Sequence, residues 1–392
     1  MKMKHTVRLL WPLILMGLML HVGVASAQLH VISKVVSKKT GEALPLASVY
    51  IDGEKNTISN MEGEFSIDAN PSDVLRISYL GYKTVRIPAS NVGRKVALET
   101  EEGTLDEVVV HSSEYYVDKV RSKQRSEFRK WRWERYQFFY RQTTFTDNKC
   151  TTFLETFFTG LSAIQVRDLI LLTGRYWTVA SSLTVNPLNY YTFAQVPVAD
   201  TNFELGEQLV PLIGFYKRYY QVDCRAMTDG ERNIYVLHFV PRDMEQWSVE
   251  GDLYVDAETF QLLRYKGFGH KDNVKNIIRG QQHVVPADYS FEVNYMQENG
   301  FTEVQSVHFD VYFEDFGKKY HTSGLLFNVG ERFSQGKKKL GFSDNLLREI
   351  SQKGYDPQFW RDNEIVKRTP VEEEVIELVE SDNLFGVFGN QK

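Results

Sequence analysis

Two neighbouring segments alternate apolar and polar residues so regularly that they fix the class of structure. Between Tyr289 and Met296, and again between Thr302 and Phe313, every second residue is mostly aromatic or branched aliphatic. A period of two is the period of a β-strand. The Asn299-Gly300 step between the segments is typical of a tight turn. The sequence therefore predicts a long antiparallel hairpin, in a sheet with one covered face and one solvated face.

The rest of the chain also favours strands. A second hairpin is expected from Asp252–Val255 and Phe260–Tyr265, which are joined by four residues. The 392 residues include 25 Phe and 21 Tyr, and aromatic residues are enriched in strands. At about 100–200 residues per domain, a chain of this length predicts two domains. We expect a mainly β protein with some helix, of the α+β class.

The first 27 residues have the three parts of a secretory signal. Basic residues precede an apolar stretch from Leu9 to Val24, which ends in Ala25-Ser26-Ala27. The small-residue tripeptide is the pattern that signal peptidase cuts, and the apolar stretch is shorter than the roughly 20 residues of a membrane span. We expect residues 1–27 to be removed from an exported protein of the periplasm or outer envelope. Gln28 stands where a lipoprotein has Cys, so acylation is not expected.

The charge balance gives no support to a broad surface for nucleic acid. The chain has 46 basic and 51 acidic residues, a net charge of −5, and no nucleic-acid partner is expected. Basic residues concentrate between Glu114 and Arg141, where Glu114–Arg135 has helical spacing. We favour a surface helix whose apolar side lies on a sheet. The alternative is a patch for anionic polymer or lipid headgroups, helped by Trp131, Trp133 and Tyr136.

Residues 29–110 consist of short strand-like runs broken by Gly, Asn and Pro turns. That rhythm is typical of an antiparallel β-sandwich. Four runs resemble, in order, the motifs of the carboxypeptidase-D regulatory-like domain of Bacteroidetes proteins: Thr40–Val49, Glu62–Ile67, Leu75–Tyr82 and Leu105–Val110. The resemblance implies a seven-stranded prealbumin-like sandwich in residues 28–110. It also implies a spacer or interaction module without a catalytic role.

The resemblance brings no zinc chemistry with it. A zinc peptidase needs a His/Glu pair and a distant His, and within residues 29–110 the sequence has His30 alone. TonB-dependent outer-membrane receptors often begin with the same module. However, the residues after Val110 are too few for their barrel and plug, and His111-Ser112-Ser113 replaces the Gly-Tyr-Gly that usually follows. We therefore do not expect a receptor.

Residues 111–350 are expected to form an antiparallel β domain that begins with the helix, and residues 351–392 a tail with an acidic helix. Stretches of both parts resemble those that follow the module in exported Bacteroidetes proteins of unknown function. They are Phe139–Gln142, Phe153–Glu155 and Tyr355–Trp360. A curved meander packed on a helix also resembles the half-barrel of periplasmic lipoprotein carriers, a likeness that transfers no function.

The acidic helix of the tail has a clear start signal. Thr369-Pro370-Val371-Glu372 is a capping box with Pro in the first turn. Apolar residues then recur at helical spacing among glutamates, which predicts one face docked on the rest of the protein. The residues of that predicted face are Val371, Val375, Leu378 and Val379.

Motifs for catalysis and for metal binding are missing from the sequence, so no catalytic residue, cofactor or metal is predicted. His308, Asp310 and Tyr312 share a strand face, but such spacings often arise by chance. The histidines after the signal are scattered singly: His30, His111, His238, His270, His283, His308 and His321. Core packing is a stronger expectation than sugar stacking for Trp131, Trp177, Trp247 and Trp360.

Cys150 and Cys224 are the two cysteines. Either a disulfide in an oxidising compartment or two half-buried thiols would fit the sequence.

Three function classes follow from these observations. We expect a non-enzymatic cell-envelope accessory protein, whose sandwich presents the second domain to an envelope protein or a hydrophobic ligand, with the binding residues unassigned. The first alternative is a half-barrel that carries a lipid or another hydrophobe, and it predicts a continuous apolar cavity under the meander. The second alternative is a hydrolase whose site is assembled from scattered His, Asp and Glu residues.

Overall fold

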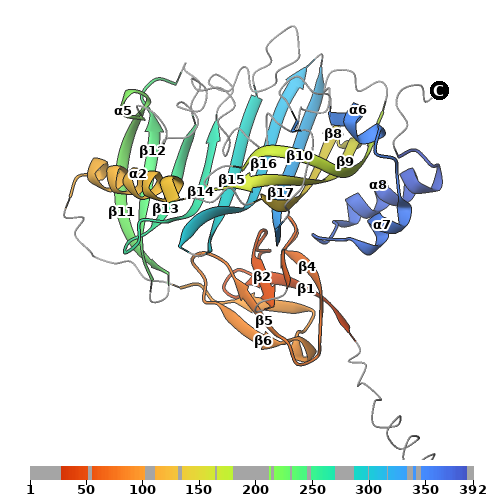
Figure 1. Cartoon of the computed structure of the whole chain (residues 1–392), viewed down its shortest axis with the longest axis horizontal. Helices are drawn as coiled ribbons and strands as arrows, with labels where there is room; N and C mark the ends of the chain where they lie inside the picture. Colours follow the sequence, from red (N-terminus) through yellow and green to blue (C-terminus); the bar gives the residue numbers. More distant parts are fainter. Residues whose placement is uncertain are drawn as a thin grey trace, which may run out of the picture.

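The computed structural model describes residues 28–51, 55–101, 111–130, 135–163, 166–179, 212, 216–229, 232–244, 249–269, 287–298, 300–315, 317–332, 339–340 and 346–385. Strands dominate: a small sandwich precedes one large antiparallel sheet, and helices pack on that sheet (Figure 1). The expected mainly β architecture with some helix is confirmed. Several predicted features lie outside the described residues: the signal 1–27, the run 105–110, Trp131, Trp133, Trp247, His270 and His283.

The N-terminal sandwich comprises β1 (Leu29–Ser37), β2 (Ser48–Ile51), β3 (Lys55–Ile58), β4 (Glu64–Ala69), β5 (Val74–Ser78), β6 (Val85–Pro88) and β7 (Lys95–Leu98). In the described part of residues 28–101 these seven strands form two sheets, ordered β4-β1-β7 and β3-β2-β5-β6. Val35, Phe65 and Leu75 are fully buried between the sheets. The sandwich is not wholly antiparallel as predicted, because the chain returns after β6 to lay β7 parallel to β1.

The large sheet comprises β8 (Arg135–Thr146), β9 (Lys149–Ser162), β10 (Val166–Thr178), β11 (Tyr220–Asp229), β12 (Arg232–Pro241), β13 (Glu250–Asp256), β14 (Leu262–Gly269), β15 (Ala287–Glu298), β16 (Phe301–Asp315) and β17 (Lys318–Arg332). Both predicted hairpins are present, as β13–β14 and β15–β16.

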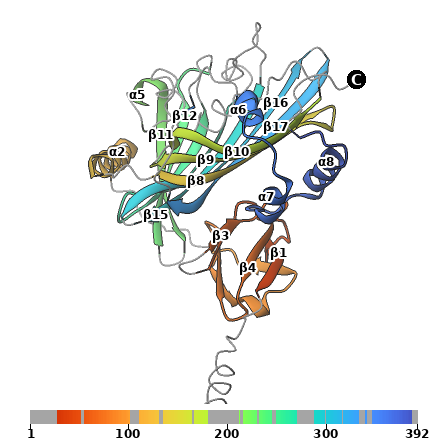
Figure 2. The ribbon, with the colours of Figure 1, turned by 45° about the vertical axis from the view of Figure 1, so that its right-hand side comes forward.

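The strand order of the large sheet is β10-β9-β8-β17-β16-β15-β14-β13-β12-β11 among the described residues. The chain therefore enters the sheet in the middle at β8 and runs outward to β10. It resumes at the opposite edge with β11 and returns to β17, which pairs with β8. Figure 2 shows that this sheet is strongly twisted and curved.

One face of the large sheet is the predicted dry face. Alternate side chains of β15 and β16, such as Phe291, Val293 and Phe309, are buried there. The helices α2 (Ser113–Lys130), α5 (Tyr216–Tyr219) and α6 (Leu346–Ser351) contribute to the same apolar cluster. α2 agrees with the favoured interpretation of its sequence, because Tyr116 and Val120 are buried against the sheet.

The opposite face was expected to be solvated, and for part of the sheet this expectation is wrong. The helices α7 (Pro357–Asp362) and α8 (Pro370–Ser381) cover it, with Trp360 packed on Phe157 and Val379 in a cluster with Phe153. The physical reason lies in β9, where Phe153-Leu154 and Phe157-Phe158 place apolar side chains on both faces. A strand of that kind must be covered on both sides.

The start of α8 is confirmed and its predicted docking face is partly wrong. Thr369 and Glu372 form the capping box. Val371 and Leu378 are exposed, whereas Ile376 and Val379 are buried. α8 is rotated in this way because Glu372 and Glu380 face buried arginines of the sheet. Glu372 is one turn before Ile376, and Glu380 follows Val379 directly. Among the described residues, no helix combines the length and the apolarity that crossing a membrane requires.

Candidate functional site

A polar groove lies where the sandwich meets the large sheet. Its volume is about 820 Å³. Its walls come from β2, β3, β5 and β6 on the sandwich side, and from β11, β12, β14, β15 and β16 on the sheet side. Figure 1 shows the sandwich beneath this end of the sheet. Sequence reasoning left the binding residues unassigned because the two walls are distant in the chain and no local motif records their contact.

Hydrogen bonds across the junction hold the two walls together. Ser48 Oγ donates to Gln305 Oε1 at 3.2 Å, and Gln305 Nε2 donates to the hydroxyl of Tyr50. The backbone amide of Gly81 donates to Asp229 Oδ1 at 2.9 Å. Each of these bonds joins the sandwich to the sheet. The shape of the groove is therefore set by the way the two domains dock.

Four arginines line the groove, two of them on the sheet side. Arg264 is buried, its Nε donates to Asn294 Oδ1 at 2.9 Å, and its Cζ lies 4.6 Å from the centroid of the Tyr79 ring. Arg232 lies 3.6 Å from a carboxylate oxygen of Asp256. Both sheet-side arginines thus have polar partners on their own domain.

The two sandwich-side arginines, Arg76 and Arg86, face each other as register partners on β5 and β6. Arg76 Cζ lies 5.1 Å from the centroid of the Tyr50 ring, and its Nε is buried without a hydrogen-bond partner. Oδ1 of Asn56, in the same wall, is also buried without a partner. Within the described residues neither Arg76 nor Arg86 forms an ion pair. The positive charge of this wall is therefore uncompensated.

The titratable groups of the groove are suited to binding. Burial raises the pKa of Tyr50 and of Tyr79, so both phenols stay protonated near neutral pH and can donate hydrogen bonds. Burial also raises the pKa of Asp229, against the opposing effect of the Gly81 amide and of Arg232 and Arg264. The groove offers guanidinium, phenol and amide groups from its two walls.

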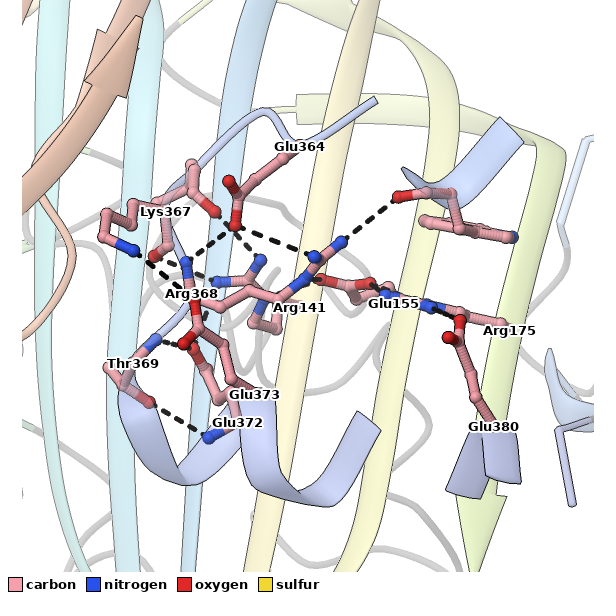
Figure 3. Close-up of polar contacts among 12 residues, drawn as sticks. Arg141, Glu155, Arg175, Glu364, Lys367, Arg368, Thr369, Glu372, Glu373 and Glu380 are labelled. Atoms are coloured by element: carbon pink, nitrogen blue, oxygen red, sulfur yellow. Dashed lines mark hydrogen bonds and ion pairs between the residues drawn. The ribbon is translucent and has the colours of Figure 1, made fainter. Parts of the chain in front are cut away.

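A second polar cluster lies under α8, on the same face of the large sheet as the groove (Figure 3). Glu155 on β9 sits between two buried arginines: Arg141 Nε donates to Oε1 at 2.8 Å, and Arg175 Nη2 donates to Oε2 at 2.6 Å. From α8, Glu372 Oε2 accepts from Arg141 and Glu380 Oε1 from Arg175, both at 3.2 Å. A chain of alternating charges thus fastens α8 to three strands.

The electrostatics of this cluster indicate a structural role. Burial alone would raise the pKa of the Glu155 carboxyl, but Arg175 and Arg141 outweigh burial and hold that pKa at about 2. The second guanidinium nitrogen of Arg141 donates to the carbonyl of Val366 at 2.9 Å. Since the charges satisfy one another, the cluster has little capacity left for a ligand. Arg141 and Glu155 were not assigned a role from the sequence, and no local pattern indicated this clamp.

The histidine face of β16 comes together with β17 in the structure. His308 Nε2 lies 3.1 Å from Ser323 Oγ, and His321 Nε2 lies 2.7 Å from Asp310 Oδ1. The ring of Tyr312 stacks on His321 at 4.2 Å between centroids. A Ser-His-Asp triad needs the carboxylate on the histidine nitrogen opposite the hydroxyl. Here Asp310 approaches the same Nε2 of His308, at 3.7 Å, so the geometry is not that of a triad.

The remaining histidines among the described residues are not gathered into one site. His30 bonds to Asp68 at 2.7 Å on the sandwich, and His238 bonds to Asp252 at 2.9 Å on the sheet. His111 lies against the ring of Tyr115. Across the described part of the chain, no group of three metal-ligating side chains is close enough to hold a metal ion.

The tryptophans and cysteines that the structure describes are packing residues. Trp177 and Trp360 belong to the apolar clusters under α7 and α8, in line with the core-packing expectation. Cys150 and Cys224 are free thiols, because they lie on β9 and β11, near opposite edges of the large sheet. Burial raises the pKa of Cys150 to about 12 and that of Cys224 to about 11.

Comparison with known proteins identifies the sandwich. Residues 33–110 match the family model of the CarboxypepD_reg-like domain. This chain contains a CarboxypepD_reg-like domain. The resemblance drawn from the sequence motifs is thereby confirmed, and the groove has one wall in this domain and the other in the large sheet.

Two curated relatives match this chain over the CarboxypepD_reg-like domain. The TonB-dependent receptor P26 of Formosa agariphila is 42% identical over 88 residues, which are 22% of this chain and 9% of the receptor. The TonB-dependent receptor SusC of Bacteroides thetaiotaomicron is 32% identical over 87 residues, again 22% of this chain and 9% of the receptor. The match therefore spans about a tenth of the length of these relatives.

Solved structures show weaker likenesses. A LolA superfamily protein from Nitrosomonas europaea has 12% sequence identity and a TM-score of 0.25, covering 58% of this chain and 96% of that protein. A DUF1329 family protein from Desulfovibrio piger has 11% identity and a TM-score of 0.25, covering 57% of this chain and 95% of that protein. TM-scores this low carry no functional argument.

Proposed function

We propose that this protein is a non-enzymatic binding protein of the cell envelope, and that it holds a polar ligand in the groove between the CarboxypepD_reg-like domain and the large sheet. The groove carries the proposal. Its volume of about 820 Å³ lies within the roughly 300–1,000 Å³ of small-molecule sites. Such sites are preferentially found at domain interfaces, and here hydrogen bonds between the domains preorganise both walls.

The chemistry of the groove supports binding over hydrolysis. Asp229 accepts a backbone hydrogen bond from Gly81, which fixes its carboxylate as part of the wall. The cluster around His308 lies away from the groove and does not have the geometry of a nucleophile activated by a base. The hydrolase alternative therefore receives no support from either place.

The envelope location is part of the proposal. It rests on the signal expected in residues 1–27 and on the CarboxypepD_reg-like domain, which this chain shares with proteins named TonB-dependent receptors. The division of the chain near residues 110 and 350 is likewise proposed. So is a half-barrel form for the curved sheet.

A hydrophobe carrier is the alternative for the other side of the sheet. It requires an apolar cavity under α2 and α6. Among the described residues of that face, Tyr140, Tyr265, Tyr289 and Phe291 are buried against other side chains, and the Tyr265 and Phe291 rings are 4.8 Å apart. Because this packing supports a filled core, we place the ligand in the groove.

The test is to purify the full chain from its native envelope and to identify small molecules that accompany it by mass spectrometry. Thr84 is exposed on the groove wall, and Thr84→Trp fills the groove without touching the core. Ser72→Trp, at an exposed turn of the same domain outside the groove, is the matched control. We expect a stoichiometric polar compound that Thr84→Trp loses and Ser72→Trp keeps. Retention of the compound by Thr84→Trp would refute the groove, and a stoichiometric lipid would favour the carrier.

A further inference from the structure

The sandwich-side wall of the groove contains two neighbouring arginines, Arg76 and Arg86, that have no carboxylate between them in the part of the chain that the structure describes. Arg76 and Arg86 are directly opposite each other on neighbouring antiparallel strands, a position where like charges destabilise a sheet. In contrast, Arg141 and Arg175 under α8 share a carboxylate between them. The same chain thus neutralises one arginine pair and leaves the other open at the groove.

Two buried polar atoms of this wall lack hydrogen-bond partners, and their types indicate the groups that a ligand would supply. Nε of Arg76 is a donor without an acceptor, and Oδ1 of Asn56 is an acceptor without a donor. An oxyanion is the acceptor that guanidinium groups bind most strongly, in a bidentate fashion, and a hydroxyl or amine group is the donor that an amide oxygen accepts. Neutral or purely apolar ligands leave the arginine pair unneutralised.

Aromatic rings orient the charged groups. Arg76 lies over Tyr50 and Arg264 over Tyr79, and the Tyr79 and Tyr82 rings meet edge to face at 5.5 Å. Arginine stacked on an aromatic ring has its guanidinium held in one plane. The half-buried rings of Tyr79 and Tyr82 line the groove and offer contacts for a ring that carries hydroxyl groups.

We infer that the ligand of the groove is an acidic sugar, that is, a hydroxylated ring bearing a carboxylate or a phosphate, with Arg76 and Arg86 as the residues that bind the oxyanion. This inference rests on the proposed function and names its ligand class. The anionic group lies between the two arginines and relieves their repulsion. The hydroxyl groups pair with Asn56 and with the tyrosine hydroxyls.

The experiment is isothermal titration calorimetry of the full chain at low salt with three probes. Tetragalacturonic acid carries carboxylates, glucose 1-phosphate carries a phosphate, and maltotetraose is neutral. We expect at least one anionic probe to bind, maltotetraose to bind at least tenfold more weakly, and affinity to fall with added salt. Binding of the first probe alone assigns a carboxylated glycan. Binding of the second assigns a phosphorylated sugar, and vesicles containing phosphatidylinositol 4-phosphate then tell a lipid headgroup from a free sugar.

The variants separate this inference from the proposed function. Arg76→Gln and Arg86→Gln are each expected to weaken the anionic probe at least tenfold. Arg94→Gln removes the same charge from an exposed position of the same domain outside the groove, and it should stay within twofold of wild type. Arg86→Gln should also raise the melting temperature of the ligand-free protein, because it removes the like-charge pair.

Two outcomes would overturn the inference. One is that neither anionic probe binds the wild-type protein. The other is that maltotetraose binds as tightly as the anionic probes and that Arg76→Gln and Arg86→Gln bind the anionic probes as wild type does. If Thr84→Trp then prevents maltotetraose binding, the groove is still the binding site and its ligand is neutral. An anionic probe that binds Thr84→Trp as well as wild type would instead refute the groove itself.

Discussion

Glu155→Gln tests whether the buried charge chain under α8 stabilises the fold. Glu155 is almost completely buried and is bonded to Arg141 and Arg175. Its pKa is about 2, against 4.5 for an unperturbed glutamate. At about 1.4 kcal/mol per pKa unit, the difference corresponds to about 3 kcal/mol of stability at neutral pH. Breaking a buried ion pair by removing one partner typically costs about 3–5 kcal/mol, which is the same order of destabilisation.

The depressed pKa of Glu155 determines how the free energy of unfolding should change with pH. A carboxyl whose folded-state pKa is depressed contributes its full stability above the unfolded-state pKa and loses it as the pH falls through the folded-state value. The free energy of unfolding of wild type, measured in urea, should therefore decrease as the pH falls from about 4.5 to about 2. Glu155→Gln lacks this contribution at every pH. It should be about 3 kcal/mol less stable at pH 7, and the difference from wild type should shrink as the pH is lowered.

The control is Glu373→Gln, which removes an exposed carboxylate of α8, one that pairs with Lys367 at 3.3 Å. Exposed pairs contribute about 0–1 kcal/mol, so this variant should unfold almost as wild type does. The reasoning is refuted if Glu155→Gln stays within about 1 kcal/mol of wild type at pH 7, or if the two stability profiles run parallel through the acid range.

Three further changes probe other parts of the fold. Thr369→Ala removes the capping box of α8 and should lower the free energy of unfolding by about 1 kcal/mol, with faster amide exchange confined to that helix. Gly324→Ala places a methyl group against the buried ring of Phe309 across the β16–β17 pair and should lower the free energy of unfolding by about 1–3 kcal/mol. Gly93→Ala, at a position with space for a methyl group, should leave that free energy unchanged. Equal stabilities of the two variants in urea would contradict this packing argument. The native thiols, with pKa values of about 12 and about 11, should react with iodoacetamide at pH 8 far more slowly than they do in urea, and equal rates would show that burial does not protect them.

Local patterns in the sequence predicted local structure well. The alternation in residues 289–296 and 302–313 corresponds to β15 and β16, Gly300 between them has the left-handed φ of 81° that a tight turn needs, and the capping box at Thr369 corresponds to the first turn of α8. These signals succeed because strand period, turn chemistry and helix capping depend on residues close together in the chain. The four motifs of the CarboxypepD_reg-like domain added the sandwich.

The groove and the charge clamp could not be predicted in the same way. Gln305 meets Tyr50, and Glu372 meets Arg141, only because the sandwich and α8 dock on the large sheet. Amphipathic reasoning also assigned the wrong side of α8 in part. It treats glutamate as solvent-facing, whereas Glu372 and Glu380 turn towards arginines whose burial no sequence pattern disclosed.

The seam between β8 and β17 has a consequence for the order of events during synthesis. Arg141 and Leu325 are paired across it, so β8, the first strand of the large sheet in the chain, cannot complete its pairing until β17, the last strand, has been made. Until β17 leaves the ribosome, β8 presents an unpaired, aromatic edge of the kind that invites pairing with other chains. Non-local pairing of this sort is also slow. Nascent chains stalled before residue 318 should therefore need a chaperone to remain unaggregated, whereas chains released after α8 should be able to close the sheet on their own.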